Sequence, residues 1–254
     1  MSASINLKTY TEFPSEIIDE IQVPVFCSPQ YANYLKQVNS QEVSWFTGFL
    51  NETMICIIPF SIIKKAIFKK GIFLTSVVFL SEFNETLEKV FLESVINHIR
   101  ENKTCDWIQQ PPNWAIFRSV PSNSIYCEFG TYRIDLKDKE KIQILKKMHR
   151  DHRQHIIHAI KNTDIVVKKG PELVDDCIEV FTVSSARKFV ELPTKEDIDK
   201  MLEYLPGNIQ IYVSYYNTVP QSSIIYFPDN ICYYAVYAAM IAHPAEGINH
   251  ILHW

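Results

Sequence analysis

The chain has 254 residues, of which 47% are hydrophobic and 21% are charged, and its formal net charge is −4. These values are ordinary for a globular protein, and they exclude a low-complexity or disordered chain. The length suits two domains of about 120 residues each. Because the chain is acidic overall, we expect no extended nucleic-acid partner.

Several functional classes are excluded by features that the sequence lacks. No apolar run reaches membrane-spanning length, and residues 1–13 lack the basic and apolar regions of a signal peptide, so we expect a cytoplasmic protein without a transmembrane segment. The six cysteines include no CxxC pair, which favours buried thiols over disulfides or a zinc ribbon. The six glycines are too widely spaced for a P-loop or a Rossmann fingerprint, so side chains or a helix N-terminus must bind any phosphate.

The first half of the chain predicts a mixture of strands and helices. Apolar residues at helical spacing predict a helix within residues 24–38 and a longer amphipathic helix over residues 84–103. Aromatic and β-branched residues predict two strands over 42–63, joined at Asn51-Glu52, and a third strand within 64–80. Residues 105–114 are interpreted as a strand that ends at Pro111-Pro112.

A domain boundary is predicted after residue 128, because the order of elements begins again beyond Gly130. The predicted domains are therefore 1–128 and 129–254, both of the α+β class. The elements expected in the second domain are, in order, a strand (131–136), helical structure (about 138–162), a strand (164–170), two helices (173–189 and 194–205), a hairpin (208–227), a strand (231–240) and the start of a helix (248–254). Thr194 and Asp197 predict a capping box, and Asn217-Thr218 the turn of the hairpin.

The segment from Met148 to Asn162 carries four histidines at three-residue spacing. One continuous helix through it would place His149, His152 and Arg153 on the buried seam. A simpler interpretation breaks the helix: the first part ends near Lys147, and Asp151 caps a second part. Histidines at three-residue spacing drift around a helix and cannot converge on one ion, and the usual i,i+4 zinc pair is missing, so we predict no metal site.

A second group of histidines (His243, His250 and His253) occurs near the end of the chain, but nothing in the sequence brings the two groups together. Residues 137–162 contain eight basic and three acidic side chains, on an acidic chain. This local excess suits a small anionic ligand better than a long nucleic acid, and a solvated basic face is the equal alternative.

The order of these elements resembles a known family. Arg153, Ile156, Ala159 and Lys161 fit an R-x-x-I-x-x-A-x-K pattern, and the tyrosine-rich strand "YYAVYAA" and the helix start "EGINHILHW" follow in the expected order. In the first half, "VFCSPQYANYLK" is similar to an aromatic–lysine segment of the same family. The resemblance is to the FemAB/FemX-like peptidoglycan-bridge aminoacyltransferases, a bacterial family within the GNAT-like acyltransferase superfamily.

This resemblance implies two tandem GNAT-like domains with mixed central sheets and an enzyme that transfers an acyl or aminoacyl group to an amine. The acceptor would be an anionic small molecule or a nucleotide-linked substrate, and the donor an acyl-CoA or aminoacyl co-substrate, with no other cofactor implied. By position, Lys36 and Arg153 would bind phosphate, with Lys161 nearby, and arginine suits this role through its forked donors. Tyr234, on what we expect to be a central strand, and His243 are further candidates, and no catalytic residue is indicated.

The sequence also departs from the family pattern. "MIAHPAEG" stands where a Q/R-x-x-G-x-G acyl-CoA loop is expected, and the second domain is expected to be truncated at its C-terminus. An alternative hypothesis is therefore a non-catalytic binding or scaffold protein. It would form a homodimer through an exposed surface of Ile248, Ile251 and Trp254.

Overall fold

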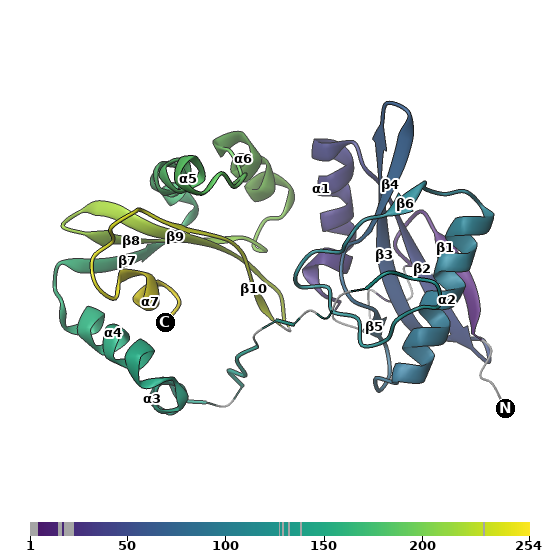
Figure 1. The fold of residues 1–254 in the computed structure, drawn as a ribbon, viewed down its shortest axis with the longest axis horizontal. Coiled ribbons are helices and arrows are strands. Elements are labelled where there is room, and N and C mark those ends of the chain that lie inside the picture. Colours follow the sequence, from purple (N-terminus) through teal and green to yellow (C-terminus); the bar gives the residue numbers. More distant parts are fainter. Residues whose placement is uncertain are drawn as a thin grey trace. The chain divides into compact units, whose positions relative to one another are not determined.

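The computed structural model describes residues 5–14, 17, 23–126, 128, 130–131, 133–137, 139–230 and 232–254. The chain divides into two compact units, Met1–Tyr132 and Arg133–Trp254, each with its own sheet and helices (Figure 1). The domain boundary that the sequence predicts after residue 128 lies four residues before this division.

Unit 1 is built on a six-stranded sheet in the order β1-β2-β3-β4-β6, with β5 paired to β3. The neighbours β4 and β6 are parallel and all other described pairs are antiparallel, so the sheet is mixed, as expected. The strands are β1 (Asn6–Tyr10), β2 (Glu42–Leu50), β3 (Thr53–Lys65), β4 (Phe68–Phe73), β5 (Val78–Phe79) and β6 (Trp107–Ile108).

The central hairpin of this sheet buries both of its faces. Asn51 and Glu52 both have positive φ, which gives the tight two-residue turn between β2 and β3 that the sequence predicts. On one face Phe46 and Phe60 pack with α2 (Glu85–Glu101), and on the other face Trp45 packs with α1 (Pro29–Asn39), near the short helix η2 (Val25–Cys27). Figure 1 shows the two helices on opposite sides of the sheet.

Unit 2 is built on a four-stranded sheet in the order β10-β9-β8-β7, and every described pairing is antiparallel. Asn217 and Thr218 have positive φ and form the two-residue turn of the β8–β9 hairpin, as predicted. The strands are β7 (Ile165–Lys169), β8 (Gln210–Tyr216), β9 (Val219–Pro228) and β10 (Tyr233–Met240).

Helices cover both faces of the second sheet, which explains why β8 and β9 are almost wholly buried. On one face, α5 contacts β8, β9 and β10, and α6 packs on α5; on the other face α7 contacts β7, β8 and β9 and packs against α4 (Figure 1). The helices are α3 (Lys141–Lys147), α4 (Arg150–Lys161), η3 (Pro171–Leu173), α5 (Val174–Lys188), α6 (Lys195–Tyr204) and α7 (Ile248–Leu252). Thr194 and Asp197 form the predicted capping box at the start of α6.

Three local predictions are wrong. Residues 133–136 form no strand, and their side chains are exposed, because no neighbouring strand offers them a partner among the described residues. β10 is an edge strand and not a central one, so Tyr234 does not lie in the middle of the sheet. The expected exposed dimer surface is also wrong at Ile248, which is fully buried within unit 2.

Candidate functional site

The helical region of unit 2 breaks at the α3–α4 junction, as the simpler interpretation of the sequence predicts. Met148 is extended, and His149, not Asp151, is the N-cap residue of α4. The Nδ1 atom of His149 accepts a long hydrogen bond from the Asp151 amide at 3.4 Å. The Arg153 guanidinium donates to the carbonyl oxygen of Lys146 at 3.3 Å, so this side chain ties α4 back to the end of α3.

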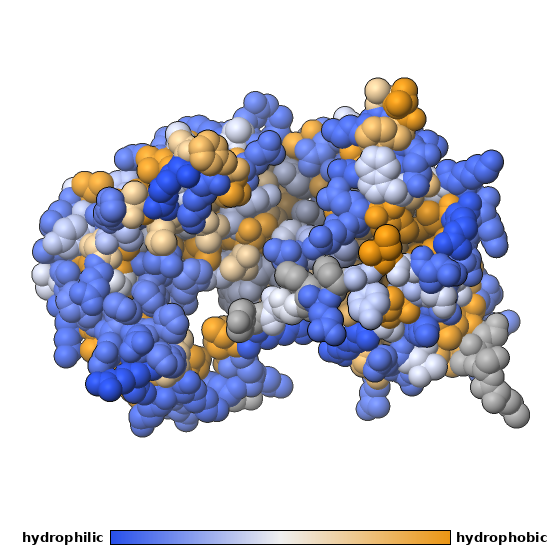
Figure 2. All heavy atoms as spheres, in the orientation of Figure 1, coloured by the Kyte–Doolittle hydropathy of each residue, from blue (hydrophilic) through white to orange (hydrophobic). Residues whose placement is uncertain are grey.

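A basic pocket of about 280 Å³ lies beside this junction, between residues 133–135 and 139 on one side and α3 on the other. Among the described residues that line it, Arg133, Lys139 and Lys147 are cations and Asp135 is acidic. Ile144 and Met148 form part of an apolar wall. Lys139 is ion-paired with Asp135 and also donates to the Asp135 carbonyl oxygen at 3.1 Å. The surface over α3 and α4 is strongly hydrophilic (Figure 2).

The two histidine groups of the sequence meet where α7 packs on α4. His250 on α7 lies between His152 and His155 on α4: its Nε2 is 3.1 Å from His152 Nδ1, and its ring stacks on His155 with a centroid distance of 4.7 Å. Glu246 Oε1 lies 3.2 Å from His155 Nδ1, although the two do not form an aligned hydrogen bond. Burial, and then the neighbouring His155, His152 and His253, lower the pKa of His250.

Close backbone contact holds α7 in this position. Gly247 precedes the helix with φ +79°, and a side-chain carbon there would come closer than 3.0 Å to the carbonyl oxygen of His155. The buried Ser222 hydroxyl is within hydrogen-bond distance of two acceptors: Asn249 Oδ1 on α7 at 2.9 Å and the Ala239 carbonyl oxygen on β10 at 3.0 Å. These contacts fix α7, and with it His250, against α4.

The loop between β10 and α7 is also anchored from within unit 2. The Gln221 side chain accepts from the Ala245 amide at 2.7 Å. Arg187 on α5 donates to the carbonyl oxygens of Met240 at 3.1 Å and Ile241 at 3.3 Å. The loop that carries His243 therefore leaves the sheet along a defined path.

β10 has one edge without a partner strand among those that the structure describes, and it is bulged between Ala235 and Tyr237. Bulged edge strands offer backbone donors and acceptors, and they are frequent beside active sites. Burial raises the pKa of the Tyr234 phenol, Asp229 and Cys232 raise it further, and Arg133 opposes the rise. Tyr234 therefore stays protonated at neutral pH and can donate a hydrogen bond, which suits a general base poorly.

Comparison with known proteins then decides the fold. No family model matches the chain, and no curated protein matches it. Among solved structures, the crystal structure of FemX matches with a TM-score of 0.60 at 10% identity, covering 92% of this chain and 80% of that one. The fold is FemX-like. A tandem GNAT protein from the clavulanic acid biosynthesis pathway also matches, with a TM-score of 0.44 at 6% identity, covering 98% of this chain and 83% of that one.

The FemX-like fold confirms the predicted α+β class, with one sheet in each of the two units. The mixed sheet expected in both domains is found only in unit 1, because every described strand pairing in unit 2 is antiparallel. The predicted site residues lie on separate elements of this fold. Arg153 is half-buried on α4, and Lys161 is exposed at the end of the same helix. Eight residues of helix separate their backbones by about 12 Å along the axis of α4, so they lie on different turns of the helix. Tyr234 is half-buried on β10, and His243 is exposed in the loop after it.

Lys36, the remaining predicted residue, is exposed in the last turn of α1 in unit 1. The sequence did not single out Arg133, which lines the basic pocket in unit 2. A single arginine in an expected strand is not part of any motif that would predict a binding role. The sequence also did not predict the contact of His250 with the α4 histidines, because that contact depends on how α7 packs on α4.

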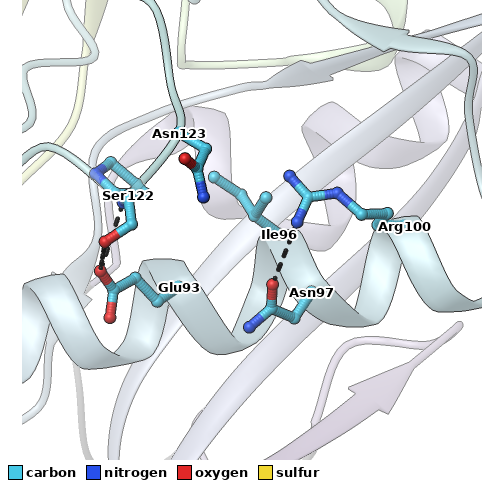
Figure 3. A pocket seen from close by; sticks show the side chains of 7 residues that line it. Glu93, Ile96, Asn97, Arg100, Ser122 and Asn123 are labelled. Atoms are coloured by element: carbon cyan, nitrogen blue, oxygen red, sulfur yellow. Dashed lines mark hydrogen bonds between the residues drawn. The ribbon is translucent and has the colours of Figure 1, made fainter.

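A second, smaller pocket of about 190 Å³ lies in unit 1, on the exposed side of α2 (Figure 3). Its Glu93 carboxylate accepts from the Ser122 hydroxyl at 2.7 Å and from the Ser122 amide at 3.2 Å. These hydrogen bonds lower the pKa of Glu93. Arg100 donates to Asn97 at 3.4 Å, so the pocket's charged groups already have partners.

Within the described parts of the chain, no group of three or more histidine, cysteine, aspartate or glutamate side chains is arranged to hold a metal ion. No described helix is long and apolar enough to cross a membrane.

Proposed function

We propose that this protein transfers an acyl or aminoacyl group from an activated donor to the amine of a phosphate-bearing acceptor. The observation that carries the proposal is the FemX-like fold, which extends over 92% of the chain. In such a transfer the amine nitrogen attacks the donor carbonyl carbon, a C–N bond forms, and the thioester C–S or ester C–O bond breaks. The protein must therefore align two substrates and stabilise the oxyanion.

The open edge of β10 supports this proposal as the place for the donor. The backbone groups on this edge have no partner strand among the described residues, and they can hydrogen-bond an extended chain that contains amide bonds, as in recognition by strand addition. An acyl-CoA carries such amides in its pantetheine arm, and an aminoacyl group carries its own amine and carbonyl. The bulge between Ala235 and Tyr237 interrupts the ladder at one point along this edge.

Five residues take proposed roles in this scheme. Tyr234, whose pKa is raised by burial, donates a hydrogen bond to the developing oxyanion. His243, exposed in the loop after β10, receives the proton that leaves the attacking amine. Arg153, Lys161 and Lys36 bind anionic groups of the substrates, each at its own position on the fold.

The test is a mass-spectrometric transfer assay. Purified protein is incubated with a panel of acyl-CoA and aminoacyl-tRNA donors and with amines that carry a phosphate. We expect at least one donor to be consumed with formation of an amide product. In the reactive pair, Tyr234→Phe should lower kcat about 100-fold, as loss of an oxyanion donor does.

Tyr233→Phe is the matched control for that variant, because Tyr233 is the exposed neighbour on the same strand. It should leave kcat within about twofold of the wild type. The proposal fails if no donor is consumed and calorimetry detects no binding of either substrate class. Equal loss in the two tyrosine variants would refute the role given to Tyr234.

A further inference from the structure

The basic pocket beside α3 contains cations that the fold itself does not neutralise. Lys139 is engaged by Asp135, and its side chain is only 26% exposed. Arg133 and Lys147 also line the pocket, and neither has an ion-pair or hydrogen-bond partner among the residues that the structure describes. Among the described residues that line it, the pocket thus has three positive charges and one negative charge.

We propose that Arg133, Lys139 and Lys147 form a binding site for a phosphate group that is attached to a small apolar or sugar-sized body. Arginine offers forked donors that match two phosphate oxygens, and lysine adds point charges. The role of this site rests on the proposed function: in the transfer reaction it would hold the phosphate of the acceptor.

The shape and lining of the pocket indicate the size of the ligand. A volume of about 280 Å³ lies just below the usual range for small-molecule sites, and it exceeds what a bare phosphate ion fills. Ile144 and Met148 form an apolar wall on α3 and just after it, against which an organic body can pack. We therefore expect an organic phosphate to bind more tightly than inorganic phosphate.

The position of the site agrees with the chemistry proposed for β10. The positive charge of Arg133 acts on both Cys232 and Tyr234, near the start of β10. A phosphate bound at Arg133 would therefore anchor an acceptor on the side of unit 2 where Tyr234 lies. Arg153, by contrast, already donates to the Lys146 carbonyl oxygen at the helix junction.

Substitution of Asp135 provides a test in which the affinity of the site for anions should rise. Its carboxylate engages Lys139, and the charge of Lys147 also acts on it, so it competes with any anionic ligand. Asp135→Asn removes this competitor and leaves the three cations in place. An exposed charge pair is worth a modest amount, so anion affinity should rise about twofold to fivefold.

The experiment is isothermal titration calorimetry of the intact chain at low ionic strength, with phenyl phosphate and inorganic phosphate as probes. Phenyl phosphate should bind the more tightly of the two. Arg133→Ala and Lys147→Ala should each weaken its binding about tenfold, as loss of a charge-assisted hydrogen bond does. Lys188→Ala, which removes an exposed lysine at the end of α5 outside the pocket, is the matched control and should change affinity less than twofold.

The proposal is overturned if Arg133→Ala and Lys147→Ala bind phenyl phosphate as the wild type does, or if Lys188→Ala weakens binding equally. A gain of affinity in Asp135→Asn supports it, because a damaged fold cannot produce a gain, and unchanged or lower affinity counts against it. If neither probe binds but the transfer assay yields product, the phosphate site fails and the proposed function stands. If both probes bind as expected and no donor is consumed, the transfer function fails and the site stands.

Discussion

Gly247 provides the sharpest test of how α7 is held on α4. At φ +79° any side chain is strained, which costs about 1–2 kcal/mol. An alanine Cβ would also approach the His155 carbonyl oxygen closer than 3.0 Å and touch the Ala159 side chain at 3.0 Å. Overpacking of this kind adds about 1–3 kcal/mol, so Gly247→Ala should lower the free energy of unfolding by about 2–5 kcal/mol.

Gly207→Ala separates the two contributions. Gly207 has nearly the same backbone conformation, φ +80°, but a side-chain carbon there would meet no atom within 4 Å. This variant should therefore lose only the conformational cost, about 1–2 kcal/mol. Urea denaturation of both variants, followed by circular dichroism, measures the difference. Equal losses would refute the argument that contact with α4 requires glycine at position 247.

Two further predictions concern buried and crowded ionisable groups. The pKa of His250 is lowered in the folded state, so the unfolded chain binds a proton more readily and the free energy of unfolding falls as the pH drops below about 6.5. His250→Asn should therefore lose less stability than the wild type between pH 7.5 and pH 5.5. Denaturation titrations at the two pH values measure this, and an equal loss in both proteins would contradict it. Glu88 is buried and accepts from the Arg118 amide and the Ser119 hydroxyl, so Glu88→Ala should cost about 2 kcal/mol in urea denaturation. Glu93→Ala, which removes a similar contact to Ser122 at the surface, should cost clearly less.

Local patterns predicted the elements of this fold well. The hairpin turns at Asn51-Glu52 and Asn217-Thr218 and the capping box of Thr194 are all confirmed, because each is specified by residues next to one another in the chain. The predicted strand over residues 131–136 failed for the complementary reason. Its alternating pattern is local, but a strand also needs a neighbour with which to form hydrogen bonds, and only the tertiary fold supplies that neighbour.

The same distinction applies to the candidate site. The sequence located the excess of positive charge around the α3–α4 junction, yet it could not say which cations have partners. Folding gives Arg153 a carbonyl oxygen and Lys139 a carboxylate, while Arg133 and Lys147 have no hydrogen-bond or ion-pair partner among the described residues. A partner within the fold uses a cation's hydrogen-bond donors, and a carboxylate partner also offsets its charge, so the cations without a described partner are the better candidates for anion binding. The structure therefore favours Arg133 and Lys147 over Arg153 as the residues that bind phosphate.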